Sequence, residues 1–167
     1  HERNRHSSRC AGTCAPASTR WRARATRVYG CRTIPRMATA APDHIVLVVD
    51  DDRRIRESVG ELLASFDLNV LTFGSAAEYI ACVLPDVPAC LVLDLELPDM
   101  NGLDLQGRLS GGEHPPIVFI SGHGDIPSSV RAIKAGAVDF LTKPFKQEDL
   151  LAAIHSALAQ SREARVA

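Results

Sequence analysis

Acidic side chains directly follow two apolar runs of this sequence, and a hydroxyl and a lysine follow two others. Asp50 and Asp51 come after the first run, Asp94 after the third, Ser121 at the end of the fourth and Lys143 just past the fifth. Clustered carboxylates repel one another unless a cation joins them, and carboxylates with water suit a hard ion such as Mg²⁺. An ammonium and a hydroxyl beside that ion can bind phosphoryl oxygens, and a carboxylate can attack phosphorus as a nucleophile. The residue types predict metal-assisted phosphoryl chemistry, provided that the fold brings them together.

The elements that must position these residues alternate between strand and helix after residue 43. Short apolar runs without polar alternation predict strands that are covered on both faces. Between them, apolar residues recur at helical spacing, as in Ile55, Val59 and Leu62. The expected strands are 44–49, 69–72, 89–93, 117–120 and 139–141, and the expected helices are 55–66, 75–84, 103–109, 126–135 and 148–159. This order predicts an α/β fold with a doubly wound, five-stranded parallel sheet of the flavodoxin-like type, whose ligands bind beyond the carboxyl ends of the strands.

Acids that follow strands have a second interpretation, because aspartate often caps the helix that comes next. Asp52 and Asp99 are interpreted as such caps. A cap would explain a single strand end, whereas four strand ends with complementary chemistry favour a shared site.

The net charge of −1 conceals two different parts of the chain. Residues 1–36 hold nine Arg and one acid, for a formal charge of +8, whereas residues 37–167 hold ten Lys and Arg against nineteen Asp and Glu, for −9. The apolar runs are too short to span a membrane, and the five cysteines are too few for a disulfide scaffold. We expect a cytoplasmic protein that binds no membrane. The acidic part is not expected to bind nucleic acid directly.

The basic segment 1–42 has neither a strand nor a helix period, and we expect it to be a disordered leader. Its arginines leave open a nucleic-acid arm or a transit peptide. His6, Cys10, Cys14 and Cys31 leave open a zinc site, although the spacing lacks a second matching pair. The preferred interpretation is a segment translated from upstream or otherwise not native, because the chain opens with His and its first methionine is Met37. The expected domain then covers 43–160, with a short tail at 161–167.

Four motifs in the acidic part resemble one known family. They are VVDDD at 48–52, LVLDLELPDMNG at 91–102, ISGHGD at 120–125 and AGAVDFLTKPF at 135–145. In this order they resemble the receiver domain of bacterial two-component response regulators, with a CheY-like fold, over about 44–159. The third and fourth motifs are most similar to the FixJ-type branch of that family.

The resemblance implies a role for each strand end. Asp94 would accept a phosphoryl group from the phosphohistidine of a sensor histidine kinase. Asp51, Asp94 and the backbone carbonyl of Glu96 would bind Mg²⁺, or Mn²⁺ in its place, and Asp50 would complete the acidic pocket. Lys143 would pair with the phosphoryl group.

The resemblance also implies a conformational switch. Ser121 would move toward the phosphoryl group and Phe140 would turn inward with it, next to a cis peptide bond between Lys143 and Pro144. The face of the fourth helix and fifth strand would then form a homodimer or control an unknown downstream protein. His123 is open to two interpretations: it tunes the attack of water on the acyl phosphate, or it is an exposed loop residue.

The expected function is therefore that of a phosphoacceptor signalling domain, with no enzymatic activity beyond its own phosphorylation and slow dephosphorylation. Three alternatives remain open: a truncated DNA-binding regulator of the same family, a phosphohydrolase with an aspartyl nucleophile, and a degenerate receiver that only binds a partner. Glu96 is an imperfect general acid for the hydrolase, and the intact Asp51, Asp94 and Lys143 argue against a degenerate receiver.

Overall fold

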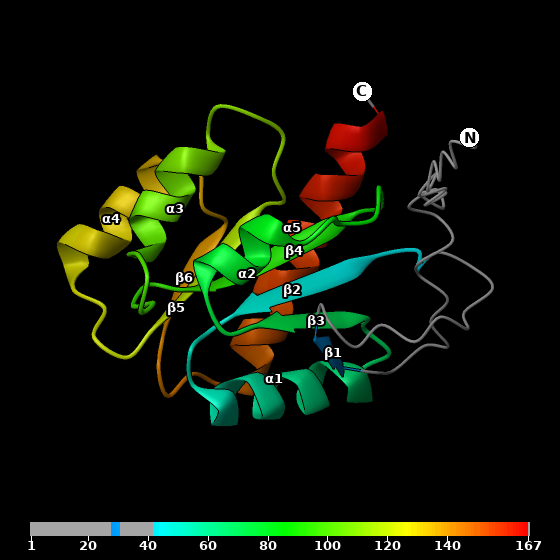
Figure 1. Cartoon of the computed structure of the whole chain (residues 1–167), viewed down its shortest axis with the longest axis horizontal. Coiled ribbons are helices and arrows are strands. Elements are labelled where there is room, and N and C mark those ends of the chain that lie inside the picture. Colours follow the sequence, from blue (N-terminus) through cyan, green and yellow to red (C-terminus); the bar gives the residue numbers. More distant parts are fainter. Residues whose placement is uncertain (1–27, 31–41, 167) are drawn as a thin grey trace, which may run out of the picture.

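A parallel sheet forms the centre of the computed structural model, which describes residues 28–30 and 42–166. In this part of the chain six strands lie in the order β1-β3-β2-β4-β5-β6 (Figure 1). The strands are β1 Val28–Gly30, β2 Ile45–Val49, β3 Val70–Phe73, β4 Ala89–Asp94, β5 Ile117–Ser121 and β6 Asp139–Thr142. The helices are α1 Arg53–Ser65, α2 Ala76–Ala81, α3 Gly102–Leu109, α4 Ile126–Lys134 and α5 Gln147–Val166. The doubly wound parallel sheet and its five expected strands are confirmed.

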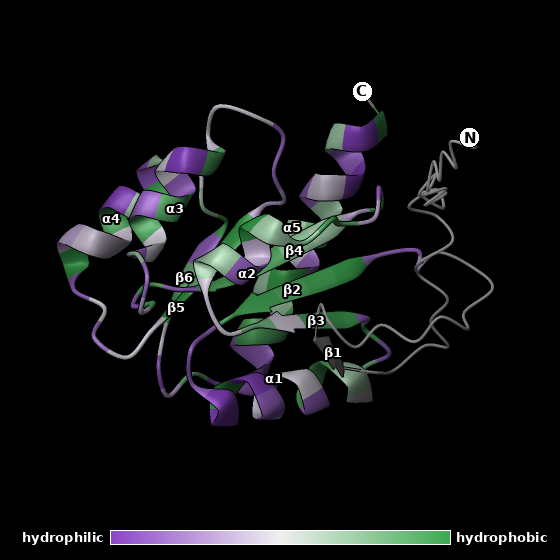
Figure 2. Cartoon of the chain, in the orientation of Figure 1, coloured by the Kyte–Doolittle hydropathy of each residue, from purple (hydrophilic) through white to green (hydrophobic). Residues whose placement is uncertain are grey.

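The sheet is covered on both faces, which explains why its central strands lack polar alternation. Every residue of β2, β4 and β5 is buried. Leu47 on β2 belongs to the core cluster that includes residues of α2, α3 and α4, whereas its neighbour Val48 belongs to the cluster that includes residues of α1 and α5. Figure 2 shows the resulting pattern, with apolar strands inside and polar residues on the outer helix surfaces.

The structure adds a strand that the sequence analysis did not predict, because residues 28–30, within the expected leader, form β1. β1 pairs in parallel with β3, with Val28 opposite Val70 and Gly30 opposite Thr72. Valine and tyrosine favour strands, but a run of three residues is too short to give a periodic signal. The other interpretations of the leader concern residues outside the described part of the chain.

The last helix is longer than predicted, so the tail expected at 161–167 is helical as far as Val166. Its final turns are attached to the start of β4: the Ser161 hydroxyl accepts the Ala89 N–H at 3.0 Å, and Arg165 donates to the backbone carbonyl of Asp86 at 2.7 Å. The apolar period lapses after Leu158, but arginine, glutamate and alanine are good helix formers and continue the helix. Within residues 42–166, no helix has the length and apolar character needed to span a membrane.

Two predicted helix caps are present, but one of them caps a different helix. The Asp52 carboxylate accepts the Arg54 N–H at 2.9 Å and caps α1. Asp99 accepts the N–H groups of Ala76 and Ala77, at 3.2 and 2.8 Å, so it stabilises α2, which precedes it in the sequence. The cap of α3 is Asn101.

Candidate functional site

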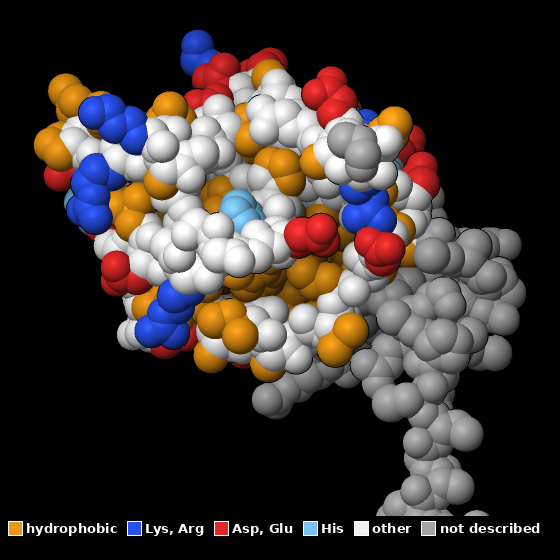
Figure 3. Space-filling model, turned by 90° about the horizontal axis from the view of Figure 1, so that it is seen from above, with side chains coloured by type: hydrophobic (Ala, Val, Ile, Leu, Met, Phe, Trp, Pro, Cys, Tyr) orange, Lys and Arg blue, Asp and Glu red, His pale blue; other side chains and the backbone are white. Residues whose placement is uncertain are grey.

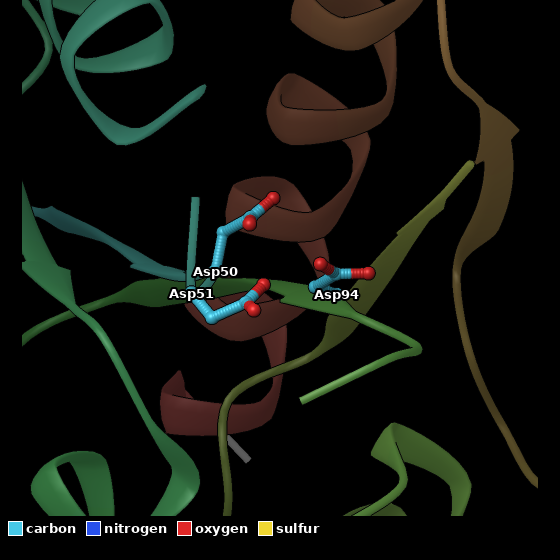
Figure 4. Close-up of side chains that lie close together, drawn as sticks. All are labelled: Asp50, Asp51 and Asp94. Carbon is cyan, nitrogen blue, oxygen red and sulfur yellow. The ribbon is translucent and has the colours of Figure 1, made fainter. Parts of the chain in front are cut away.

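The site lies at the carboxyl ends of β2 and β4, at the point where the strand order reverses. These two strands are neighbours in register, with Val49 opposite Leu93, so the residues that follow them lie side by side. Parallel sheets of this kind leave a crevice for ligands at that point. The residues that the fold brings there are Asp50, Asp51 and Asp94 (Figure 4).

The three carboxylates converge closely enough to share one ion. A carboxylate oxygen from each of Asp50, Asp51 and Asp94 lies within 4.8 Å of the others. Asp50 and Asp94 are buried, whereas Asp51 is exposed. An all-oxygen donor set that is open to water on one side suits Mg²⁺ or Mn²⁺ better than a softer metal. The residues present therefore fit a hard divalent cation.

Local hydrogen bonds orient the two buried carboxylates. Asp50 Oδ1 accepts the N–H of Asp52 at 2.9 Å, and Asp94 Oδ1 accepts the N–H of Glu96 at 3.1 Å. The turn after β4 is tight, since a Cβ on Gly102 would lie 2.6 Å from the backbone oxygen of Asp94. Only glycine permits this approach, which brings the start of α3 against the end of β4.

Lys143, the residue directly after β6, closes the cluster. Its Nζ donates to Asp50 Oδ2 at 2.8 Å and lies 3.3 Å from Asp94 Oδ2, in a partly buried position. The Lys143 N–H also donates to the backbone oxygen of Ser121 at 2.7 Å, which fixes the end of β6 against β5. The peptide bond between Lys143 and Pro144 is cis, as the resemblance implied.

Burial and charge set the protonation of this group. Burial raises the pKa of Asp94 and the charge of Asp50 raises it further, while the Glu96 N–H and Lys143 oppose them, with a net pKa of about 6. Burial alone would lower the pKa of Lys143, but its hydrogen bond to Asp50 and the charges of Asp50 and Asp94 outweigh burial and raise it. At neutral pH the site holds a largely ionised Asp94 carboxylate beside a charged ammonium.

Ser121 and Phe140 lie at the side of the site that faces α4. Ser121 is fully buried, and its hydroxyl oxygen accepts the N–H of His123 at 3.1 Å. Phe140 is half-buried, with its ring centroid 6.0 Å from that of Phe119. The ring also lies against Gly124, where a Cβ would be 2.6 Å from its Cε1 atom.

Glu96 and His123 stand at the rim of the site. His123 Nδ1 lies 3.3 Å from Glu96 Oε1, and both side chains are mostly exposed. The pair joins the loop after β4 to the loop after β5.

Arg56 is a site residue that the sequence analysis missed. Its guanidinium donates to the backbone carbonyls of Asp50 and Asp51. An arginine in the first turns of a surface helix usually faces solvent, so its type and spacing gave no signal of this contact.

The chain has a doubly wound sheet, and a carboxylate cluster and a lysine lie at the point where the strand order reverses. These features define a class of α/β proteins that can bind a cation and an anion together. Residues 46–155 match the family model described as the response regulator receiver domain. The chain belongs to this family, whose members are signalling domains of two-component systems.

Individual relatives agree with that assignment. The chain is 50% identical to nodulation protein W of Bradyrhizobium diazoefficiens over 129 residues, which cover 77% of this chain and 57% of the relative. It is 39% identical to the transcriptional regulatory protein FixJ of Azorhizobium caulinodans over 128 residues, covering 76% of this chain and 59% of FixJ. The solved structure of the response regulator StyR matches with a TM-score of 0.68 and 45% identity, covering 74% of this chain and 63% of StyR. The FixJ-type branch is confirmed, and the chain spans little more than half the length of these curated relatives.

Proposed function

We propose that Asp94 is the phosphoacceptor of this receiver domain, and that it takes its phosphoryl group from the phosphohistidine of a sensor histidine kinase. The observation that carries the proposal is the convergence of Asp50, Asp51 and Asp94 within 4.8 Å, with Lys143 bonded to two of them. In the transfer, the phosphohistidine ring is protonated on its other nitrogen, the bond between phosphorus and the imidazole nitrogen breaks, a bond to an Asp94 oxygen forms, and neutral imidazole leaves.

The chain's own residues prepare this step. Asp94, with a pKa of about 6, is largely ionised at neutral pH and can attack phosphorus. Asp50, Asp51, Asp94 and the Glu96 carbonyl would hold Mg²⁺ or Mn²⁺, which would neutralise charge on the carboxylates and the phosphoryl oxygens. Lys143 is already within hydrogen-bond reach of Asp94 and would exchange part of that contact for the new anion.

The added charge would act on the segment around Ser121 and Phe140. The Ser121 hydroxyl can rotate from the His123 N–H toward a phosphoryl oxygen, and Phe140 can fill the space that this leaves. Such a change would alter α4 and β6, which we propose as the face for a homodimer or for a downstream partner. A DNA-binding output domain is the corresponding proposal for a longer protein, since FixJ is named a transcriptional regulatory protein.

We further propose a cytoplasmic signalling domain with no turnover beyond its own phosphorylation and slow dephosphorylation. A phosphohydrolase would need a general acid near Asp94. The side chain of Glu96 pairs with His123 instead, so no observation favours that alternative.

Incubation of the full chain with Mg²⁺ and acetyl phosphate tests the proposal on a phosphate-affinity gel. We expect a retarded band for the wild type, none for Asp94→Asn, and none when the metal is chelated. Asp99→Asn is the matched control, because Asp99 is an exposed helix-capping acid of the same loop and its variant should be labelled normally. Equal labelling of Asp94→Asn and the wild type would refute the assignment.

A further inference from the structure

The loop between β2 and α1 is held by a cation that does not enter the carboxylate cluster. Arg56 Nη1 donates to the backbone oxygen of Asp50 at 2.7 Å and to that of Asp51 at 3.0 Å. A guanidinium stays charged and has its donors in a fixed plane. One nitrogen thereby fixes the orientation of two consecutive peptide groups, those that carry the two acidic side chains.

The two acids depend on this contact to different extents. Asp50 is buried and its carboxylate is bonded to Lys143 and to the N–H of Asp52. Asp51 is exposed, and within residues 42–166 its carboxylate has no hydrogen-bond partner. Within this part of the chain no contact of its own holds the Asp51 carboxylate, so the region it can reach is limited by its backbone, which Arg56 holds.

Arg56 also lies against the loop that follows β3. Its Nη1 is 3.4 Å from the place that a Cβ would occupy on Gly74. The same two loops are joined by the Asp50 N–H, which donates to the backbone oxygen of Phe73 at 3.1 Å. The guanidinium is thus placed between two loops and not on a free helix surface.

We propose that Arg56 is a positioning residue of the metal site: by fixing the carbonyls of Asp50 and Asp51, it holds the Asp51 carboxylate within reach of Asp94 before a cation binds. This inference rests on the proposed function, because it requires a divalent cation at the cluster. Residues that orient the ligands of a metal typically change metal affinity by about 10–100-fold when they are replaced.

The charge of Arg56 and its positioning role predict opposite changes in metal affinity when Arg56 is replaced. A guanidinium beside a cation site repels the incoming cation, so its removal should tighten metal binding if Arg56 acted only through its charge. If Arg56 acts by positioning, its removal should weaken metal binding despite the lost repulsion.

Titration of the full chain with Mn²⁺, followed by electron paramagnetic resonance of the free ion and without any phosphodonor, separates the two effects. We expect Arg56→Gln to raise the dissociation constant about 10–100-fold. Arg56→Lys keeps the charge but lacks the planar fork, and should fall between Arg56→Gln and the wild type. Arg53→Gln removes the same charge from the same helix, where Arg53 is exposed and paired with Glu57 at 2.7 Å, and should leave the dissociation constant unchanged.

The outcomes decide each proposal separately. Unchanged or tighter Mn²⁺ binding by Arg56→Gln overturns the positioning role. In that case, loss of Mn²⁺ binding in Asp51→Asn would still support the proposed metal site. If the wild type binds no Mn²⁺, both proposals fail. If Arg56→Gln lacks a native circular dichroism spectrum, Arg56→Lys carries the test, and wild-type affinity in that variant overturns the role.

Discussion

Helices α5 and α4 lie on opposite faces of one sheet, yet they are attached to it very differently. Helix α5 buries six residues along its length, among them Leu150, Ile154 and Leu158, which pack against the central strands. Helix α4 buries only Ala132 and exposes Ile126, Val130 and Ile133. On the side where α3 and α4 lie, the surface mixes hydrophobic side chains with Lys and Arg (Figure 3).

The carboxylate cluster therefore lies on a firmly packed part of the molecule, whereas the helix next to it, α4, is packed loosely. Asp50, Asp94 and Lys143 sit on strand ends that the sheet holds firmly. Elements with little apolar burial are those that open or shift at low cost in free energy. Helix α4 buries little apolar surface, and the polar contact that ties it to another helix, from Gln106 of α3 to Ala132, lies at its C-terminal end. This arrangement suits the segment that we propose to move when Asp94 is phosphorylated.

Replacement of one isoleucine in each helix should give the largest contrast. Ile154→Ala removes a fully buried side chain from α5 and should cost about 2–5 kcal/mol of unfolding free energy. Ile133→Ala removes a side chain that is 46% exposed and should change stability by about 0.5 kcal/mol or less. Urea denaturation of both variants measures the difference, and similar losses would contradict the comparison.

Two aspartates should shift stability in opposite directions with pH. The folded pKa of Asp94 is raised to about 6, so the native state favours the protonated form, and the stability that this gives at low pH is lost as the pH rises from about 4 to 6. Asp94→Asn should therefore stabilise the metal-free protein at pH 8, with a gain that disappears near pH 4. Thermal unfolding at several pH values measures this effect.

The matched variant is Asp125→Asn at the start of α4. Hydrogen bonds from the Ser128 side chain and backbone lower the pKa of Asp125, so its contribution is present at neutral pH and is lost as the pH falls through the folded pKa. Asp125→Asn should destabilise at pH 7 and have no effect at low pH. If both variants change the stability in the same direction, the opposite pKa shifts of Asp94 and Asp125 do not govern the pH dependence of stability.

Two glycines of the loop before α4 provide a smaller and more local test. A Cβ at Gly124 would meet the ring of Phe140 at 2.6 Å, whereas a Cβ at Gly122 would meet no atom within 4 Å. Gly124→Ala should cost about 1–3 kcal/mol because the ring must move, and Gly122→Ala should be close to neutral. Phe140→Leu added to Gly124→Ala should recover part of the loss, and equal losses for the two glycine variants would contradict the contact.

The strand ends were predictable because buried parallel strands are recognisable in the sequence as apolar runs. The residues that follow these runs all lie at the same edge of the sheet. Asp50, Asp94 and Lys143 followed from that rule alone. The contact between Gly124 and Phe140 did not, because it joins the loop after β5 to strand β6, and their approach depends on the packed sheet. Arg56 was missed for the same reason, since its partners are backbone atoms, which carry no sequence signal.

The smallest expected effect concerns the C-terminal end of α4, where a side chain from α3 reaches across. Gln106 is buried and its Nε2 donates to the backbone oxygen of Ala132 at 3.1 Å. That oxygen also accepts the N–H of Ala137, and Gly136, at a φ of 102°, donates to Ile133, as in a Schellman cap. Gln106 therefore ties α3 to the cap that ends α4, which makes this end the fixed one and leaves the end near Asp125 free to move.

Gln106→Met keeps the length of the side chain and removes the donor. The Ala132 carbonyl retains its bond from Ala137, so the loss should be only about 1 kcal/mol, and amide hydrogens of α4 should exchange about fivefold faster while those of α1 and α5 do not change. Gln160→Met, at an exposed position of α5, is the control and should alter neither helix. If Gln106→Met accelerates exchange equally in α4 and α5, the two faces of the sheet are not independently attached, and the separation between a firm site and a loosely held response element does not hold.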